Sequence, residues 1–326
     1  MALADPAAVL EIGVDLAAVR AAHSRIRSHV HRTAVLSSRS LDSVAGATLF
    51  FKCENLQKVG AFKARGACNA VFSLDDVEAK RGVVTHSSGN HGAAVAWAAA
   101  RRGIPAWVVM PENAALVKKN AVQGLGGTIR FCAPTLAARD ETCTAVQAET
   151  GAVLIHPYDD WRVIAGQGTA ALEFLEEVPA LDAIVTPVGG GGLLAGTAIA
   201  ARGTRPSIEV YGAEPAGADD AWRSLQSGRI VPQTDPRTIA DGLRSSLGEK
   251  TFAVLSTAVD AIGTVSEDAI VHAMRLTWHR LKLIIEPSSA VPLAALIERK
   301  LPLAGRRVGI VLTGGNVDLD RLPWQN

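Results

Sequence analysis

The stretch VTPVGGGGLLAGTA, residues 185–198, sets four consecutive glycines between an apolar segment and an alanine-rich one. The apolar segment predicts a buried strand, and the residues after the glycines predict a helix. Because glycine carries no side chain, Gly189, Gly190, Gly191 and Gly192 leave backbone N–H groups open to an anion at the positive end of that helix. We therefore expect an α/β protein with a phosphate site at this turn. A tight turn with close helix packing is the simpler alternative.

Strands and helices alternate on both sides of this turn, which is typical of parallel sheets covered by helices. Helices are expected after an N-cap at Asp15 and over residues 91–103 and 218–228, the last two ending in glycine. Strands are expected over residues 48–55, 82–88, 106–111, 128–132, 152–156, 183–188, 207–214, 261–266 and 306–314.

The four strands between residues 82 and 156 have short, regular connections and could form a sheet of their own. We therefore predict a small lobe, residues 75–157, inserted into a large lobe made of residues 1–74 and 158–326. The cleft between two such lobes is the expected ligand site.

Composition narrows the functional classes. The 326 residues are 48% apolar and 20% charged, as in a folded soluble protein. The net charge of +1, from 33 basic and 32 acidic residues, offers no field for nucleic acid or an anionic membrane. No segment has the roughly 18 apolar residues of a membrane helix, and the acidic start does not resemble a signal peptide. We expect a cytoplasmic protein.

Metal and disulfide chemistry have little support in the sequence. The four cysteines form no CxxC pair, so buried or free thiols are expected. The eight histidines include no HExxH motif, which argues against a transition-metal enzyme.

The glycine turn also fits a dinucleotide-binding fingerprint. Gly190, Gly192 and Ala195 match GxGxxA, and the acidic Glu214 ends the next expected strand. A nicotinamide-dependent oxidoreductase is therefore an alternative function. The position in the middle of the chain and the width of a four-glycine turn argue against it.

A lysine with an unusual setting follows the first long strand, in KCENLQKVGAFKARGACNAV, residues 52–71. Lys63 starts a predicted helix and is flanked by small or apolar residues. Desolvation and the helix dipole both favour the neutral amine, which is the form that condenses with aldehydes. An ordinary exposed helix lysine is the alternative.

Two more polar turns follow expected strands. In THSSGNHGAAVAWAAA, residues 85–100, the side chains of Ser87, Ser88, Asn90 and His91 and the free N–H groups of the helix start can bind a carboxylate. In IVLTGGNVDL, residues 310–319, Thr313 offers a hydroxyl at the carboxyl edge of a parallel sheet.

Together, in this order and over residues 15–325, the four segments resemble the serine/threonine dehydratase and serine racemase group of pyridoxal-phosphate enzymes. That group is marked by a lysine segment of the type [S/A]-F-K-x-R-G-A, then S-S-G-N-H-G, a four-glycine phosphate loop and [S/T]-G-G-N-V-D. The resemblance implies fold type II, similar to tryptophan synthase β, with two parallel-sheet lobes and pyridoxal 5′-phosphate in the cleft. The nicotinamide alternative predicts nothing about Lys63 or Thr313.

The resemblance also implies a role for each segment. Lys63 would bind the cofactor covalently, and residues 189–193, which end with Leu193, would bind its phosphate. Asn90 would lie by the ring hydroxyl and Thr313 by the pyridine nitrogen. Ser88 would exchange a proton on the face opposite Lys63, or only contact the substrate carboxylate. A hydroxyl beside the pyridine makes the cofactor a modest electron sink, which suits β-elimination.

EPAGADD, residues 214–220, resembles the divalent-cation site of the group. Glu214, the Ala218 carbonyl and Asp220 would supply hard oxygen ligands for Mg²⁺ or a similar ion. An acidic helix N-terminus without an ion is the alternative.

The substrate is indicated by Arg139 in LAARDET, residues 136–142. It lies where relatives have an arginine facing the cleft, and a guanidinium would pair with a second substrate carboxylate. An exposed helix arginine is the alternative. Ala61 and Tyr158 depart from the serine and asparagine of many racemases, and the C-terminal motifs EPSSAVPLA and TGGNVDLDRLPW resemble 3-hydroxyaspartate dehydratases.

The expected function is therefore β-elimination from a small β-hydroxy amino acid. 3-Hydroxyaspartate would give iminosuccinate, which hydrolyses to oxaloacetate and ammonia. Serine/threonine dehydratase and serine racemase are the alternatives, and a binding protein without catalysis is a more remote one. The expected assembly is a homodimer, and the expected partners exclude nucleic acid and membranes.

Overall fold

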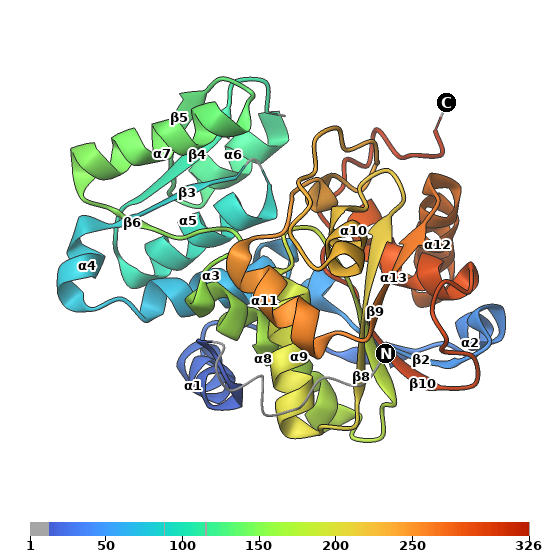
Figure 1. Cartoon of the computed structure of the whole chain (residues 1–326). Helices are drawn as coiled ribbons and strands as arrows, with labels where there is room; N and C mark the ends of the chain where they lie inside the picture. The colour runs from blue at the N-terminus through green and yellow to red at the C-terminus, as the bar shows by residue number, and fades with distance from the viewer. Residues whose placement is uncertain (1–12, 88, 115, 326) are drawn as a thin grey trace.

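Two mostly parallel sheets organise the chain (Figure 1). The computed structural model describes residues 13–87, 89–114 and 116–325. In that part of the chain a six-stranded sheet has the order β1-β2-β10-β7-β8-β9, and a four-stranded sheet has the order β5-β4-β3-β6. The pairing of β1 with β2 is antiparallel, and the other pairings are parallel. The expected α/β class is confirmed.

All nine expected strands are present. The larger sheet contains β1 (Val35–Ser37), β2 (Thr48–Lys52), β7 (Ala183–Pro187), β8 (Glu209–Pro215), β9 (Ala261–Val265) and β10 (Arg307–Val311). The smaller sheet contains β3 (Val83–His86), β4 (Ala106–Pro111), β5 (Thr128–Cys132) and β6 (Val153–Leu154). The sequence did not predict β1, because three residues at a sheet edge carry no periodic pattern.

The helices follow the expected alternation. They are α1 (Leu16–Ile26), α2 (Arg39–Ala45), α3 (Lys63–Phe72), α4 (Asp76–Arg81), α5 (Asn90–Arg102), α6 (Leu116–Gly124), α7 (Leu136–Thr150), α8 (Trp161–Glu177), α9 (Gly192–Thr204), α10 (Asp220–Ser227), α11 (Glu249–Ala258), α12 (Glu267–Leu281) and α13 (Pro287–Ile297). Asp15 caps α1 by accepting the Ala18 N–H at 2.9 Å. Gly103 and Gly228 end α5 and α10 in the left-handed conformation, as expected.

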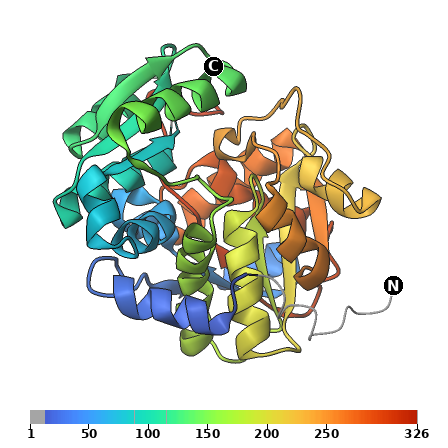
Figure 2. The same cartoon turned by 60° about the vertical axis from the view of Figure 1, so that its left-hand side comes forward.

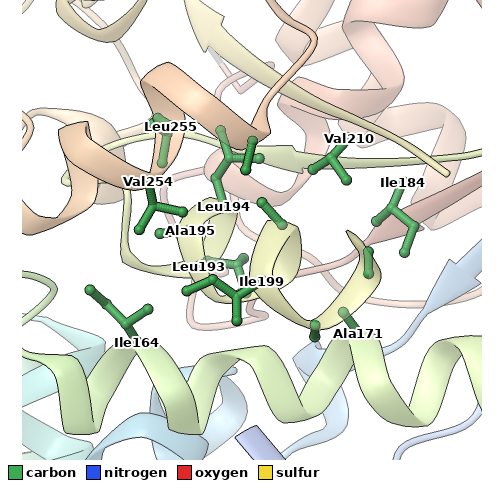
Figure 3. Close-up of a cluster of buried hydrophobic side chains, with 14 of the residues drawn as sticks. Ile164, Ala171, Ile184, Leu193, Leu194, Ala195, Ile199, Val210, Val254 and Leu255 are labelled. Atoms are coloured by element: carbon green, nitrogen blue, oxygen red, sulfur yellow. The ribbon is translucent and has the colours of Figure 1, made fainter. Parts of the chain in front are cut away.

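Helices cover both faces of the larger sheet. Neighbouring residues of a strand point to opposite faces, so Ile184 packs with α1, α8, α9 and α11, whereas Val185 packs with α2, α12 and α13. Figure 3 shows the first of these cores, in which Leu194 and Ile199 of α9 gather with side chains of α8, α11 and the sheet. The helix that follows the glycine turn is therefore anchored in the core along its length.

The smaller sheet has its own helices, as both views show (Figures 1 and 2). Val108 of β4 packs with α5 and α6, and Val109 packs with α7. All four strands of this sheet fall between Val83 and Leu154, inside the predicted small lobe. The lobe boundaries at 74/75 and 157/158 stay a prediction, and we use "small lobe" and "large lobe" for these residue ranges.

The strand order brings the glycine turn and the turn that contains Thr313 to the same edge of the larger sheet. Strands β7 and β10 are parallel neighbours, so their carboxyl ends, which lead to Gly189 and Thr313, lie side by side. The four cysteines are free and buried, as expected. Among the described residues, no helix is both long and apolar enough to cross a membrane.

Candidate active site

Lys63 lies at the first position of α3, beside the end of β10. The Phe62 N–H donates to the Thr313 carbonyl at 2.9 Å, and Ala61 forms an isolated antiparallel bridge with Gly314. These contacts hold residues 61–62 against residues 313–314, although the two segments are far apart in the sequence. The predicted lysine and the predicted threonine hydroxyl are therefore brought together.

The amine of Lys63 has no acidic partner among the described residues. Its Nζ donates to the Pro157 carbonyl at 2.8 Å. Burial lowers the pKa of Lys63 to about 8, although the Glu286 carboxylate opposes that change. A larger fraction of the amine is thus neutral near pH 7 than in an exposed lysine, which supports the nucleophilic role predicted from the sequence.

The four glycines form a buried turn between β7 and α9. Gly191 has a φ of +86°, a conformation that favours glycine, and α9 begins at Gly192 without a side-chain cap. A Cβ on Gly190 would collide with the Tyr158 ring. Leu193 points into the core and is 5% exposed, so only its N–H group can face an anion. The turn is a cradle of uncapped N–H groups of the kind that binds phosphate.

The polar turn after β3 leads into α5. His91 is buried and lies with its Nε2 3.2 Å from the Ile155 carbonyl, while its Nδ1 has no partner among the described atoms. Burial and the nearby Lys63 charge hold the pKa of His91 well below its usual value, so its ring is neutral. Ser87 Oγ accepts the Gly89 N–H at 3.2 Å. Ser88 lies outside the described residues, and its role stays a prediction.

Thr313 is almost fully buried, and its hydroxyl is fixed. Its Oγ1 lies 2.9 Å from Ser289 Oγ, which also accepts the Gly314 N–H at 2.8 Å. Ser289 belongs to α13, so this helix supports the threonine from behind. The sequence did not single out Ser289.

Glu286 is the main site residue that the sequence reading missed. It precedes α13, is 6% exposed and accepts the Asn90 amide at 3.0 and 3.1 Å on its two oxygens. Burial raises the pKa of Glu286 to about 7. An acid before proline at a helix start is an ordinary pattern, and the only sequence signal was the EPSSA motif itself.

Arg139 lies on α7 in the small lobe and is partly buried. Its Nε is buried without a hydrogen-bond partner, and it forms no salt bridge with any described residue. Burial lowers the pKa of His86, Asp140 raises it, and the Arg139 charge lowers it, which places the guanidinium near the end of β3. A partly buried guanidinium with a spare N–H donor is suited to a carboxylate ligand.

The predicted cation ligands lie at the end of β8 and the start of α10. Glu214 accepts the Trp222 N–H at 2.8 Å, and Asp220 accepts the Leu247 N–H at 3.2 Å through Oδ2, while its Oδ1 has no hydrogen-bond partner among the described residues. Burial and the Asp220 charge hold the pKa of Glu214 well above its usual value. Ala218 is buried in the turn between them. The described residues contain no cluster of three or more His, Cys, Asp or Glu side chains suited to a metal.

The chain is similar to known proteins over almost all of its length. A family described as "Pyridoxal-phosphate dependent enzyme" matches residues 26–314. A beta-hydroxyaspartate dehydratase of Paracoccus denitrificans (strain Pd 1222) is 51% identical over 304 residues, 93% of this chain and 96% of that protein. A serine racemase of Dictyostelium discoideum is 50% identical over 313 residues, 95% and 97% of the two chains. The solved structure of maize serine racemase has a TM-score of 0.92 and 48% identity, covering 94% of this chain and 95% of that one.

Proposed function

The chain belongs to the family of pyridoxal-phosphate dependent enzymes, and from this premise we propose that it dehydrates 3-hydroxyaspartate. Its fold is that of the fold-type II members, and its relatives identify it as a lyase-type enzyme. The observation that carries the proposed substrate is the buried, unpaired Nε of Arg139. The 51% identity to a beta-hydroxyaspartate dehydratase supports it. The match to this family argues against the alternative of a nicotinamide-dependent oxidoreductase.

The residues present fit pyridoxal phosphate. The uncapped start of α9 and its glycines suit the phosphate group, and Lys63 offers an amine with a lowered pKa. Asn90 and Thr313 would hold the ring from two sides. When bound, the cofactor stabilises negative charge at the α-carbon of an amino acid, which allows the α-proton and the β-hydroxyl group to leave.

Lys63 is the residue that we assign to the transfer of the α-proton. An amine must be neutral to accept a proton, and burial already lowers the cost of that state. The Pro157 carbonyl, at 2.8 Å, holds the free amine in place. Replacing Lys63 removes both the attachment of the cofactor and this base.

The two substrate carboxylates would meet different elements. The uncapped start of α5, with Ser87, Asn90 and His91, would bind the α-carboxylate through N–H and side-chain donors. Arg139 would bind the distal carboxylate, which serine and threonine lack. Discrimination between 3-hydroxyaspartate and these amino acids therefore depends on one guanidinium.

Serine racemase or serine/threonine dehydratase activity is the second candidate. The 50% identity to a serine racemase favours it, because this value is nearly equal to that for the dehydratase. Both candidate activities would use the same cofactor site, the same lysine and the same site for the α-carboxylate. They differ in that only 3-hydroxyaspartate needs Arg139.

We also propose that Glu214, the Ala218 carbonyl and Asp220 bind Mg²⁺ or a similar cation. The unpaired buried Asp220 Oδ1 supports this proposal, because it is a hard oxygen donor without a partner. Burial raises the pKa of Asp220 to about 6, and a bound cation would offset the cost of ionising it beside Glu214.

A homodimer in the cytoplasm completes the proposal. Light scattering of the purified protein measures the assembly, and a mass equal to that of a single chain would contradict the dimer.

The experiment that tests the function is a substrate panel. The purified protein, loaded with pyridoxal phosphate, is assayed for keto acid and ammonia with the four stereoisomers of 3-hydroxyaspartate, L-serine, D-serine and L-threonine. We expect the highest kcat/KM with one isomer of 3-hydroxyaspartate. Turnover of serine or threonine alone would contradict the proposal and favour the second candidate.

A further inference from the structure

Glu286 does not act as a cap for its own helix. It holds the N-cap position of α13, yet its side chain makes no hydrogen bond to the first turn. The carboxylate is instead turned toward the end of β10, where a Cβ on Gly314 would lie 2.5 Å from Oε1. Gly314 follows Thr313 directly, so the acid lies at the wall that also holds the threonine hydroxyl.

The Glu286 carboxylate, in the large lobe, holds the side-chain amide of Asn90, which belongs to the small lobe. Asn90 Nδ2 donates to both Glu286 oxygens, and Asn90 Oδ1 accepts from Asn316 Nδ2 at 2.9 Å. Asn316 Nδ2 also donates to the Val59 carbonyl at 2.8 Å, which sets the orientation of that amide. Because an ionised carboxylate only accepts hydrogen bonds, the Asn90 amide has a single orientation that satisfies both neighbours. One N–H of Asn90 is used by Glu286, and the other is available to a ligand.

We infer that Glu286 is a positioning residue of the cofactor site, which acts through Asn90 and joins the small lobe to the large lobe at that point. The ionised acid keeps the free amide N–H of Asn90 directed at the ring hydroxyl of the cofactor. This inference rests on the proposed function only through the cofactor contact of Asn90. It does not depend on which amino acid is the substrate.

Glu286 is expected to change its protonation state near neutral pH. Burial raises its pKa to about 7, Asp241 raises it, and Lys118 and the Asn90 hydrogen bond lower it. Lys63 is the other titrating group that feels the carboxylate. Below about pH 7 the protonated acid is a weaker acceptor and holds the Asn90 amide less firmly, so that the hydrogen bond from Asn316 is left as the main constraint on it. Cofactor binding should therefore weaken as the pH falls through this value.

The test uses Glu286→Gln, which keeps the shape and removes the charge. Cofactor affinity is measured by titrating the apoprotein with pyridoxal phosphate and following the visible absorbance and protein fluorescence. We expect affinity to fall roughly 5- to 10-fold above pH 7, where the acid is ionised, because the glutamine oxygen is a neutral and weaker acceptor for the Asn90 amide. The part of the pH dependence that comes from Glu286, near pH 7, should disappear in the variant, whereas the part that comes from Lys63, near pH 8, should remain. Glu177→Gln, an exposed acid on α8, is the control and should behave like the wild type.

A double-mutant cycle tests whether Glu286 acts through Asn90. If it does, Asn90→Ala should weaken cofactor binding, and adding Glu286→Gln should cause no further loss. Additive losses would overturn the inference, because they mean an independent role for the acid. Unchanged cofactor affinity and an unchanged pH profile in Glu286→Gln would overturn it as well. Since substrate is absent from these titrations, failure of the proposed substrate leaves their outcome unaffected.

Discussion

Two lysines that are eleven residues apart, Lys52 and Lys63, lie in opposite electrostatic settings. Lys52 is fully buried and pairs with Glu173 at 2.9 Å, in a cluster that also contains Arg65 and Glu54. Arg65 Nε and Nη2 lie 2.7 Å from Glu54 and Glu173, respectively, so each charge of the cluster has a partner. Within the described part of the chain Lys63 donates only to a backbone carbonyl, and burial lowers its pKa to about 8.

The difference separates structural charges from reactive ones. A buried charge without a partner is costly, so paired clusters hold the fold and unpaired groups mark places where a ligand completes the site. Arg65 lies two residues after Lys63 on α3 and fixes that helix to Glu54, just after β2, and to Glu173 of α8. The cluster in which every charge is paired thus positions Lys63, which has no acidic partner among the described residues.

The largest expected effect is that of removing the unpaired lysine. Lys63→Ala should abolish covalent attachment of the cofactor and lower kcat by about 10⁴-fold, because it removes the attachment point and the base together. Mass spectrometry after borohydride reduction measures the attachment. Lys118→Ala, which removes the partner of the exposed Asp241, is the control and should keep the adduct. An adduct on a lysine other than Lys63 would overturn the assignment.

Breaking the paired cluster should affect folding instead. Arg65→Met leaves Glu54 and Glu173 without their main partner and should lower the free energy of unfolding by about 3–5 kcal/mol. Urea unfolding measures this change. The exposed pair of Arg130 and Glu149 offers the control, since Arg130→Met should cost less than about 1 kcal/mol. If the two variants lost the same free energy of unfolding, the buried cluster would contribute no more to stability than an exposed ion pair, which would contradict this prediction.

The pH dependence of cofactor attachment tests the lowered pKa of Lys63. Only the neutral amine reacts, so the attachment rate of the apoprotein should rise with pH and level off above about 8. Relative to an ordinary lysine, the neutral fraction near pH 7 should be roughly 300-fold higher. Stopped-flow absorbance measures the rate. A rate that continues to rise up to the pH at which exposed lysines titrate would show that burial does not lower this pKa.

The smallest expected effect concerns the proposed cation site at Glu214 and Asp220. Mg²⁺ should stabilise the wild type by about 2 kcal/mol or less, which corresponds to a few degrees in Tm. Asp220→Asn should abolish this stabilisation, because it removes a charged ligand. Asp219→Asn is the matched control, since Asp219 pairs with Arg223 and should leave the Mg²⁺ effect intact. The same Mg²⁺ effect in wild type and Asp220→Asn would exclude this site.

The sequence predicted the features that depend on local patterns. The nine strands, the cap at Asp15 and the glycine ends of α5 and α10 follow from periodicity and short-range chemistry. The apolar neighbours of Lys63 predicted its desolvation. Glu286 escaped prediction because its partner Asn90 is 196 residues away, and Arg65 because Glu173 is 108 residues away. Such pairs arise from the packing of helices that are distant in the sequence, which no local pattern contains.

The effect of Arg139→Met on substrate preference tests the proposed substrate most directly. We propose that the Arg139 guanidinium, which forms no salt bridge with any described residue, selects a substrate with a second carboxylate. Losing a desolvated charge pair costs on the order of 2 to 5 kcal/mol, so kcat/KM for 3-hydroxyaspartate should fall roughly 30- to 5,000-fold. Turnover of serine should fall far less, because serine has no distal carboxylate. Equal losses on the two substrates would contradict the claim and show that Arg139 binds the α-carboxylate or supports the fold.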